Sequence, residues 1–116
     1  MNRKVSVAPM MDCTDRHERY FLRLISKNTL LYSEMVVSEA IHRGDKKKLL
    51  EFNINEKPIA LQFGGSSPTL LAEATKAGED FGYDEINLNL GCPSKKVEKN
   101  KFGACLMKEP NLVADC

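Results

Sequence analysis

The 116-residue sequence lacks the features that mark membrane-spanning, secreted and disulfide-bonded proteins. It has no run of about 18 apolar residues of the kind that crosses a membrane. The segment after the N-terminal Met is too short in apolar residues and too polar for a signal peptide. The four cysteines form no C-x-x-C pair and are too sparse for a disulfide scaffold. These absences predict a cytoplasmic protein with reduced thiols.

The sequence also has almost no net charge, because 17 Lys and Arg residues oppose 16 Asp and Glu residues. A free-standing nucleic-acid-binding domain is usually strongly basic, so this balance argues against one. Basic residues do gather locally, at 46–48 and at Lys95, Lys96, Lys99 and Lys101. Taken alone, such runs are more often solvated surface than binding sites.

Short apolar runs alternate with amphipathic stretches along the whole chain. The apolar runs at 5–10, 30–36, 58–64 and 85–91 predict strands, and helices are expected at 16–26, around 38–52, after Ser66 and Ser67, and from Pro110. The first helix carries apolar residues at helical spacing, Tyr20, Phe21, Leu24 and Ile25. Strands and helices that alternate every 25–30 residues or so indicate βα units and a parallel sheet.

An open doubly wound sheet and a closed (β/α)8 barrel both fit this alternation. In the third strand Ile59, Leu61 and Phe63 are large and apolar, whereas Gln62 belongs to a small and polar face, and the fourth strand repeats the pattern. A sheet between two helical layers is apolar on both faces, so the polar face favours the barrel. Since a barrel takes about 250 residues, we expect residues 1–116 to be the N-terminal half of a TIM barrel, with four βα units and the remainder absent.

Cys92 is the sharpest candidate for a catalytic residue. It follows the fourth strand, and TIM-barrel sites lie at the carboxyl ends of strands. Gly91 permits a tight turn and a close approach of a ligand, and Pro93 fixes the exit of the chain. The competing interpretation is a small buried side chain, which is the usual role of a free cysteine. Cys105, among apolar and small residues, fits that second role better.

Three further polar side chains lie near predicted strand ends, Glu34, Gln62 and Asn89. Burying such groups is costly unless they find partners. Each therefore either contacts a ligand or hydrogen-bonds a neighbouring part of the fold. The spacing of the remaining cysteines and the two histidines does not indicate a metal site, so we expect none.

Motifs over almost the whole chain match one family. They are Val7-Ala-Pro-Met10, Thr14-Asp-Arg-His17, Leu31-Tyr-Ser-Glu-Met35, Ala60-Leu-Gln62 with Gly65-Ser66, and Tyr83-Asp-Glu-Ile-Asn-Leu-Asn-Leu-Gly-Cys-Pro-Ser94. Together they resemble the tRNA-dihydrouridine synthases, and the last motif is highly specific. The second motif looks most like the bacterial A-type subfamily.

The resemblance implies an FMN-containing (β/α)8 barrel followed by a smaller helical domain that holds tRNA. It implies that NADPH reduces FMN, that hydride reaches carbon 6 of a uridine in the tRNA D-loop, and that Cys92 protonates carbon 5. A thiol of ordinary pKa, near 8.5, is mostly protonated at neutral pH and can act as that acid. The uridine must leave the tRNA fold to enter such a pocket.

The resemblance also assigns the residues around the cofactor and the base. Pro9, Met10 and Met11 match the segment that lies along the flavin, and Gln62 matches a contact to the flavin ring. Asn89 matches a residue that meets the substrate base.

In this context Lys95 and Lys96, which directly follow the Cys92 loop, are expected to contact tRNA phosphates. We expect the complete protein to be a cytoplasmic monomer. The family's later flavin-phosphate contacts and its tRNA-holding domain lie outside this sequence, so residues 1–116 alone are expected neither to hold FMN tightly nor to reduce uridine. Two alternatives stay open: an FMN barrel that acts on a free pyrimidine, such as a dihydroorotate dehydrogenase, and a non-catalytic, RNA-binding remnant.

Overall fold

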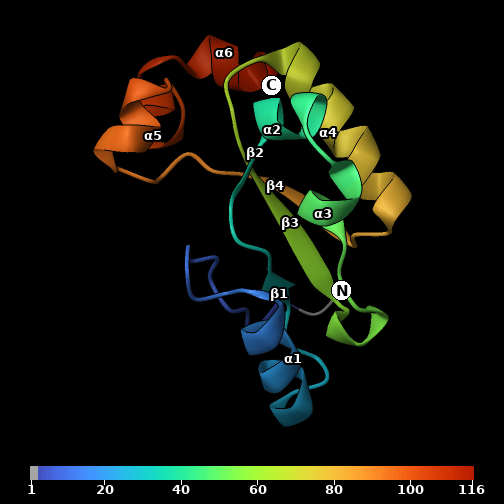
Figure 1. Ribbon diagram of the computed structural model, residues 1–116. Coiled ribbons are helices and arrows are strands. Elements are labelled where there is room, and N and C mark those ends of the chain that lie inside the picture. The colour runs from blue at the N-terminus through green and yellow to red at the C-terminus, as the bar shows by residue number, and fades with distance from the viewer. Residues whose placement is uncertain (1–2) are drawn as a thin grey trace.

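The computed structural model describes residues 3–116 as a parallel sheet with helices packed against it (Figure 1). The helices are α1 (Arg16–Ile25), α2 (Ser38–Arg43), α3 (Lys46–Leu50), α4 (Pro68–Phe81), α5 (Lys95–Lys99) and α6 (Pro110–Asp115). The strands are β1 (Leu31–Tyr32), β2 (Val36–Val37), β3 (Ile59–Gly64) and β4 (Glu85–Leu88), and two 3-10 segments are η1 (Ile54–Glu56) and η2 (Gly103–Lys108).

Every strand pair in the sheet is parallel, and β3 lies at its centre. β1 and β2 pair with one edge of β3, and β4 pairs with the other. An isolated parallel bridge between Ser6 and Leu30 adds the N-terminal segment beyond β1. Neighbouring positions in the sheet thus follow the order of the chain, as in a (β/α)8 barrel. The predicted α/β fold class with a parallel sheet is confirmed.

Three of the predicted strands are clearly shorter than the sequence indicated, and the one expected at 85–91 ends at Leu88. The strand expected at 5–10 is wrong in extent, because its only ladder contact is the bridge at Ser6. The strand expected at 30–36 divides into β1 and β2 around Ser33. The Ser33 hydroxyl accepts the backbone N–H of Gln62 at 3.0 Å and donates to the carbonyl of Glu34 at 2.7 Å. A side chain therefore takes the place of a backbone partner, and the regular ladder is interrupted there.

The predicted helices occur, and side chains cap the starts of α1, α3 and α4. Asp15 accepts the N–H groups of His17 and Glu18 at the start of α1. Ser67 caps α4, and Gly82, at a φ of 91°, ends it. The helical region expected at 38–52 is two short helices, and Asp45 caps the second. No helix among residues 3–116 combines the length and apolar character needed to cross a membrane.

The main core lies between one face of the sheet and helices α2 and α4. Its buried members are Ile41, Leu50, Leu61, Phe63, Leu71, Ala74 and Ala77, and Ile86 and Leu88 of β4 pack against them. The large apolar side chains of β3 and β4 thus face the helices, as their alternation predicted. Leu90 differs, because it packs in a second cluster with Val97, Phe102 and Leu106.

Helix α1 presents its apolar side to solvent. Tyr20, Phe21, Leu24 and Ile25 have helical spacing, but their exposed fractions run from 47% to 69%. The buried side of α1 carries Arg19 and Arg23 instead. Arg19 Nε lies 2.6 Å from Glu56 Oε2, and Arg23 Nη2 donates to the carbonyls of Glu56 and Pro58 at 2.9 Å each. The helix is therefore held on η1 by polar contacts, at the end of the sheet away from α5 and α6 (Figure 1).

Candidate functional site

The carboxyl ends of β3 and β4 bring three of the predicted site residues into contact. Gln62, on β3, is buried, and its register partner on β4 is Asn87. Gln62 Nε2 donates to Asn87 Oδ1 at 2.7 Å, and Asn89 Nδ2 donates to Gln62 Oε1 at 3.1 Å. The backbone N–H of Cys92 donates to Asn89 Oδ1 at 2.9 Å. Gln62, Asn89 and Cys92 are thus consecutive members of one hydrogen-bonded chain.

Cys92 is half-buried between the second apolar cluster and a cavity. It packs against Val97 and Phe102, and its carbonyl accepts the N–H of Ala104 at 3.0 Å. The cavity has a volume of about 290 Å³, and its lining includes both Cys92 and Cys105. Cys105 is also half-buried, and its Sγ donates to the carbonyl of Phe102 at 3.1 Å. Cys105 is therefore not the buried core residue that the sequence suggested, because it lines the same cavity as Cys92.

The two glycines near Cys92 have different roles. Neither backbone strain nor packing requires glycine at position 91, because its φ lies outside the left-handed region and a Cβ there would have no neighbour within 4 Å. A close approach of a ligand at Gly91 stays a prediction. Gly103, which sequence reasoning missed, has a φ of 71°, and a Cβ there would lie 2.6 Å from the Cys92 carbonyl oxygen. In the sequence Gly103 stands among other small residues, and nothing in that pattern indicates its contact with Cys92.

The segment 9–11 lies apart from the chain of carboxamides. Pro9 is half-buried, and Met10 and Met11 have exposed fractions of 59% and 53%. Thr14 Oγ1 accepts the N–H of Met10 and donates to its carbonyl. Within residues 3–116 no hydrogen bond joins this segment to Gln62, Asn89 or Cys92. The hydrogen-bonded chain of predicted residues therefore does not extend to this segment.

Glu34 contacts the loop that follows segment 9–11. Its Oε1 accepts the N–H of Asp12 at 2.6 Å. Of the two roles open to Glu34 from the sequence, the structure shows the contact with a neighbouring part of the fold.

Lys95 and Lys96 occupy the first turn of α5 and are exposed. Ser94 caps this helix through the N–H of Val97 at 3.2 Å. The cap places both lysines on the surface directly after the Cys92 loop, and their contact with phosphate stays a prediction.

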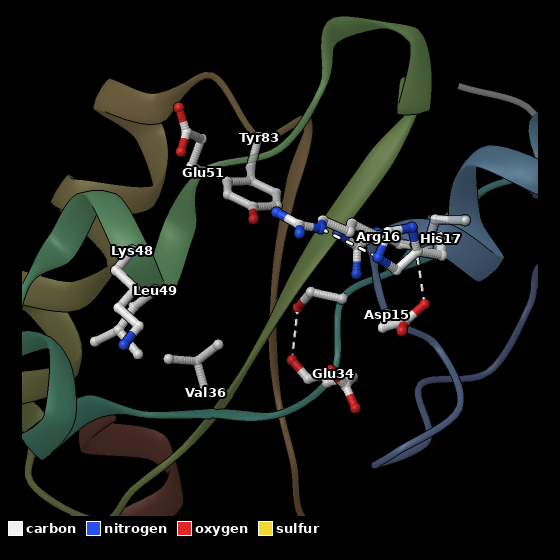
Figure 2. Close-up of a pocket in the computed structure, with 11 residues that line it drawn as sticks. Asp15, Arg16, His17, Glu34, Val36, Lys48, Leu49, Glu51 and Tyr83 are labelled. Atoms are coloured by element: carbon white, nitrogen blue, oxygen red, sulfur yellow. Dashed lines mark hydrogen bonds between the residues drawn. The ribbon is translucent and has the colours of Figure 1, made fainter.

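A second cavity, of about 280 Å³, lies between α1 and α3 (Figure 2). Figure 2 shows Asp15, Arg16 and His17 on one side of it and Glu51 and Tyr83 on the other. Burial raises the pKa of Tyr83 to about 12, and its hydroxyl donates to the carbonyl of Leu50 at 3.1 Å. Of the candidate residues only Glu34 lines this cavity, and the residues expected to bind cofactor or base and to act as the acid do not. We therefore place the candidate site at the ends of β3 and β4.

Parallel βα units in chain order, with polar side chains at the strand ends, are the arrangement expected of the N-terminal part of a (β/α)8 barrel. Residues 6–116 match the family model described as dihydrouridine synthase (Dus), and the chain belongs to that family. The resemblance seen in the motifs is confirmed.

Curated relatives cover nearly all of the chain. It is 61% identical over 112 residues to the tRNA-dihydrouridine(20/20a) synthase of Synechocystis sp. The aligned residues make up 97% of this chain and 34% of that protein. It is 55% identical over 116 residues to the enzyme of the same name from Pseudomonas aeruginosa, covering 100% of this chain and 35% of that protein. The chain thus spans about a third of the length of the curated relatives it matches.

Proposed function

We propose that the complete protein that contains this chain reduces uridine to 5,6-dihydrouridine in the D-loop of tRNA. The observation that carries the proposal is the hydrogen-bonded chain that links Gln62, Asn89 and the Cys92 loop at the strand ends. Membership of the dihydrouridine synthase family supports the same reaction. Two of the relatives at 55–61% identity carry the name tRNA-dihydrouridine(20/20a) synthase.

The residues at the strand ends fit a flavin. The side chain of Gln62 is a neutral carboxamide, which can meet the alternating carbonyl and N–H groups of a flavin ring without adding charge. Met10 and Met11 offer exposed, polarisable surface of the kind that packs on a flat ring. In the proposal, Pro9, Met10, Met11 and Gln62 hold FMN. Bound FMN, reduced by NADPH, supplies the hydride that reaches carbon 6 of the uracil.

Cys92 supplies the proton in this proposal. Its thiol gives a proton to carbon 5 of the base, and the resulting thiolate takes a proton back from solvent. A general acid must come within about 3 Å of the atom that it protonates, so the position of the loop matters. Asn89 supports that position because its Oδ1 accepts the N–H groups of Gly91 and Cys92. Asn89 Nδ2 donates to Gln62. In the proposal Asn89 also contacts the substrate base.

The proposal includes the wider partners. Lys95 and Lys96 contact tRNA phosphates, which explains a basic helix turn beside the site in a chain of almost no net charge. The complete protein acts as a monomer in the cytoplasm, without a metal.

A pair of cysteine variants in the complete protein tests the proposal. In Cys92→Ala, NADPH should still bleach the flavin, but dihydrouridine formation should fall by about 10²–10⁴-fold, because a general acid is lost. Cys105→Ala is the matched control, since Cys105 lines the same cavity and the proposal gives it no role in the reaction. Dihydrouridine is measured in tRNA by mass spectrometry.

Three results would contradict parts of the proposal. Undiminished activity of Cys92→Ala moves the acid role elsewhere. Activity on free orotate with none on tRNA favours a dihydroorotate dehydrogenase-like enzyme. Binding of tRNA with a steep salt dependence, but no flavin and no reduction, favours a non-catalytic RNA-binding role.

A further inference from the structure

The hydrogen bonds at the strand ends run in one direction. The N–H groups of Gly91 and Cys92 can only donate, so the oxygen of the Asn89 carboxamide must face them. The nitrogen of Asn89 then faces Gln62 and donates to its Oε1. The nitrogen of Gln62 in turn faces Asn87 and donates to its Oδ1. Backbone donors thus fix the orientation of three successive carboxamides.

Asn87 ends this chain and is the acceptor that holds Gln62 Nε2. Gln62 has an exposed fraction of only 6%, so water is a poor substitute for that acceptor. Gln62 and Asn87 are also paired in the β3–β4 register, which keeps their side chains on the same face at adjacent positions. With Oε1 bound to Asn89 and one N–H bound to Asn87, Gln62 keeps one N–H and one lone pair for a ligand.

We propose that Asn87 is a positioning residue that orients the Gln62 carboxamide for the flavin ring. The inference rests on the proposed function, because it takes the ligand of Gln62 to be FMN. Asn87 acts through Gln62. It supplies an acceptor at a fixed point of β4, so that the remaining N–H and lone pair of Gln62 meet the carbonyl and N–H groups of the ring edge.

The test is FMN binding by the complete protein, measured by quenching of flavin fluorescence. Asn87→Leu should weaken FMN binding about tenfold, because a buried N–H loses its acceptor. In Asn87→Ser the serine hydroxyl is too short to reach Gln62, so this variant should show the same loss of FMN binding. It replaces Asn87→Leu in the test if the leucine variant folds poorly. Asn87→Asp keeps the acceptor and should bind within about threefold of the unchanged protein. Asn111→Leu, at an exposed position on α6, is the matched control.

A double variant separates positioning from direct contact. If Asn87 acts through Gln62, Asn87→Leu adds no further loss of FMN affinity in a Gln62→Leu background. Additive losses, an unaffected Asn87→Leu variant, or an Asn87→Asp variant as weak as Asn87→Leu would each overturn the inference. The visible circular dichroism of bound flavin should change in Asn87→Leu and return in Asn87→Asp. Failure of the unchanged protein to bind FMN overturns the proposed function itself, and the positioning role with it.

Discussion

At the scale of single residues, the Cys92 loop depends on Gly103 and not on Gly91. A side chain at position 103 would meet the Cys92 carbonyl and Val97 Cγ1 at 2.5–2.6 Å, and the φ of 71° disfavours any L side chain. We expect Gly103→Ala to lower the free energy of unfolding by about 1–3 kcal/mol. Gly91→Ala, with open space around it, should stay within about 0.5 kcal/mol.

Urea unfolding followed by circular dichroism measures both variants. An equal loss in the two, or no loss in Gly103→Ala, would show that the packing of residues 102–104 on Cys92 does not hold the loop.

The sequence predicted part of this site for physical reasons. Polar side chains on one face of adjacent strands must find hydrogen-bond partners, and this requirement marks Gln62 and Asn89 as candidate site residues from the sequence alone. The role of Asn87 was less visible, because it depends on the direction of hydrogen bonds that start at the N–H groups of Gly91 and Cys92. The φ of Gly103 depends on how the following segment packs, which spacing does not reveal.

At the scale of elements, α1 is stabilised by buried charge. Glu56 is almost fully buried, and it accepts from Arg19 and from the N–H of Asn53. Removing one partner of a buried ion pair leaves the other uncompensated, at a cost of about 3–5 kcal/mol. We expect Glu56→Gln to lower the free energy of unfolding by that order. Phe21→Ser, on the exposed side, should change it by about 0.5 kcal/mol or less.

Both values come from denaturant unfolding of the two variants beside the unchanged chain. A large loss in Phe21→Ser would mean that the exposed side of α1 is covered in solution. A negligible loss in Glu56→Gln would mean that the arginines do not hold the helix.

Spacing predicted that residues 16–26 form a helix but did not predict which side is buried. Apolar periodicity normally marks the inner face. In α1 the carbonyls of Glu56 and Pro58 and one carboxylate offer acceptors to two guanidinium groups. These acceptors belong to a segment more than 30 residues away along the chain. The sequence of the helix alone therefore does not predict that its arginine side is buried.

At the scale of the whole molecule, the candidate site lies near an open side of the sheet. Within residues 3–116, β4 pairs only with β3, so its other edge has no strand beside it. A ligand at the ends of β3 and β4 is then held from one side. We expect the purified 116-residue chain to contain no tightly bound FMN and to form no dihydrouridine.

Absorbance of the purified chain in the visible region, with FMN added and then removed by gel filtration, measures retention. The complete protein, treated in the same way, is the control. Stoichiometric flavin that stays with residues 1–116 would show that the first βα units suffice to hold the cofactor.

The overall order of the sheet was predictable because each predicted strand is followed by a helix, and parallel strands need such connections. The lengths of the strands were not predictable, since the Ser33 side chain interrupts the ladder by accepting the N–H of Gln62. The N-terminal segment likewise pairs with Leu30 only through the bridge at Ser6, and its apolar pattern did not reveal how short that pairing is.

The contacts of α1 also set an order of events while the ribosome makes the chain. Arg19 and Arg23 find their partners 33 to 37 positions later, at Glu56 and Pro58. A ten-residue helix is marginal by itself, so α1 must wait until that later segment has left the exit tunnel. The first helix in the sequence therefore gains its stabilising contacts only after a segment more than 30 residues further along the chain has been made.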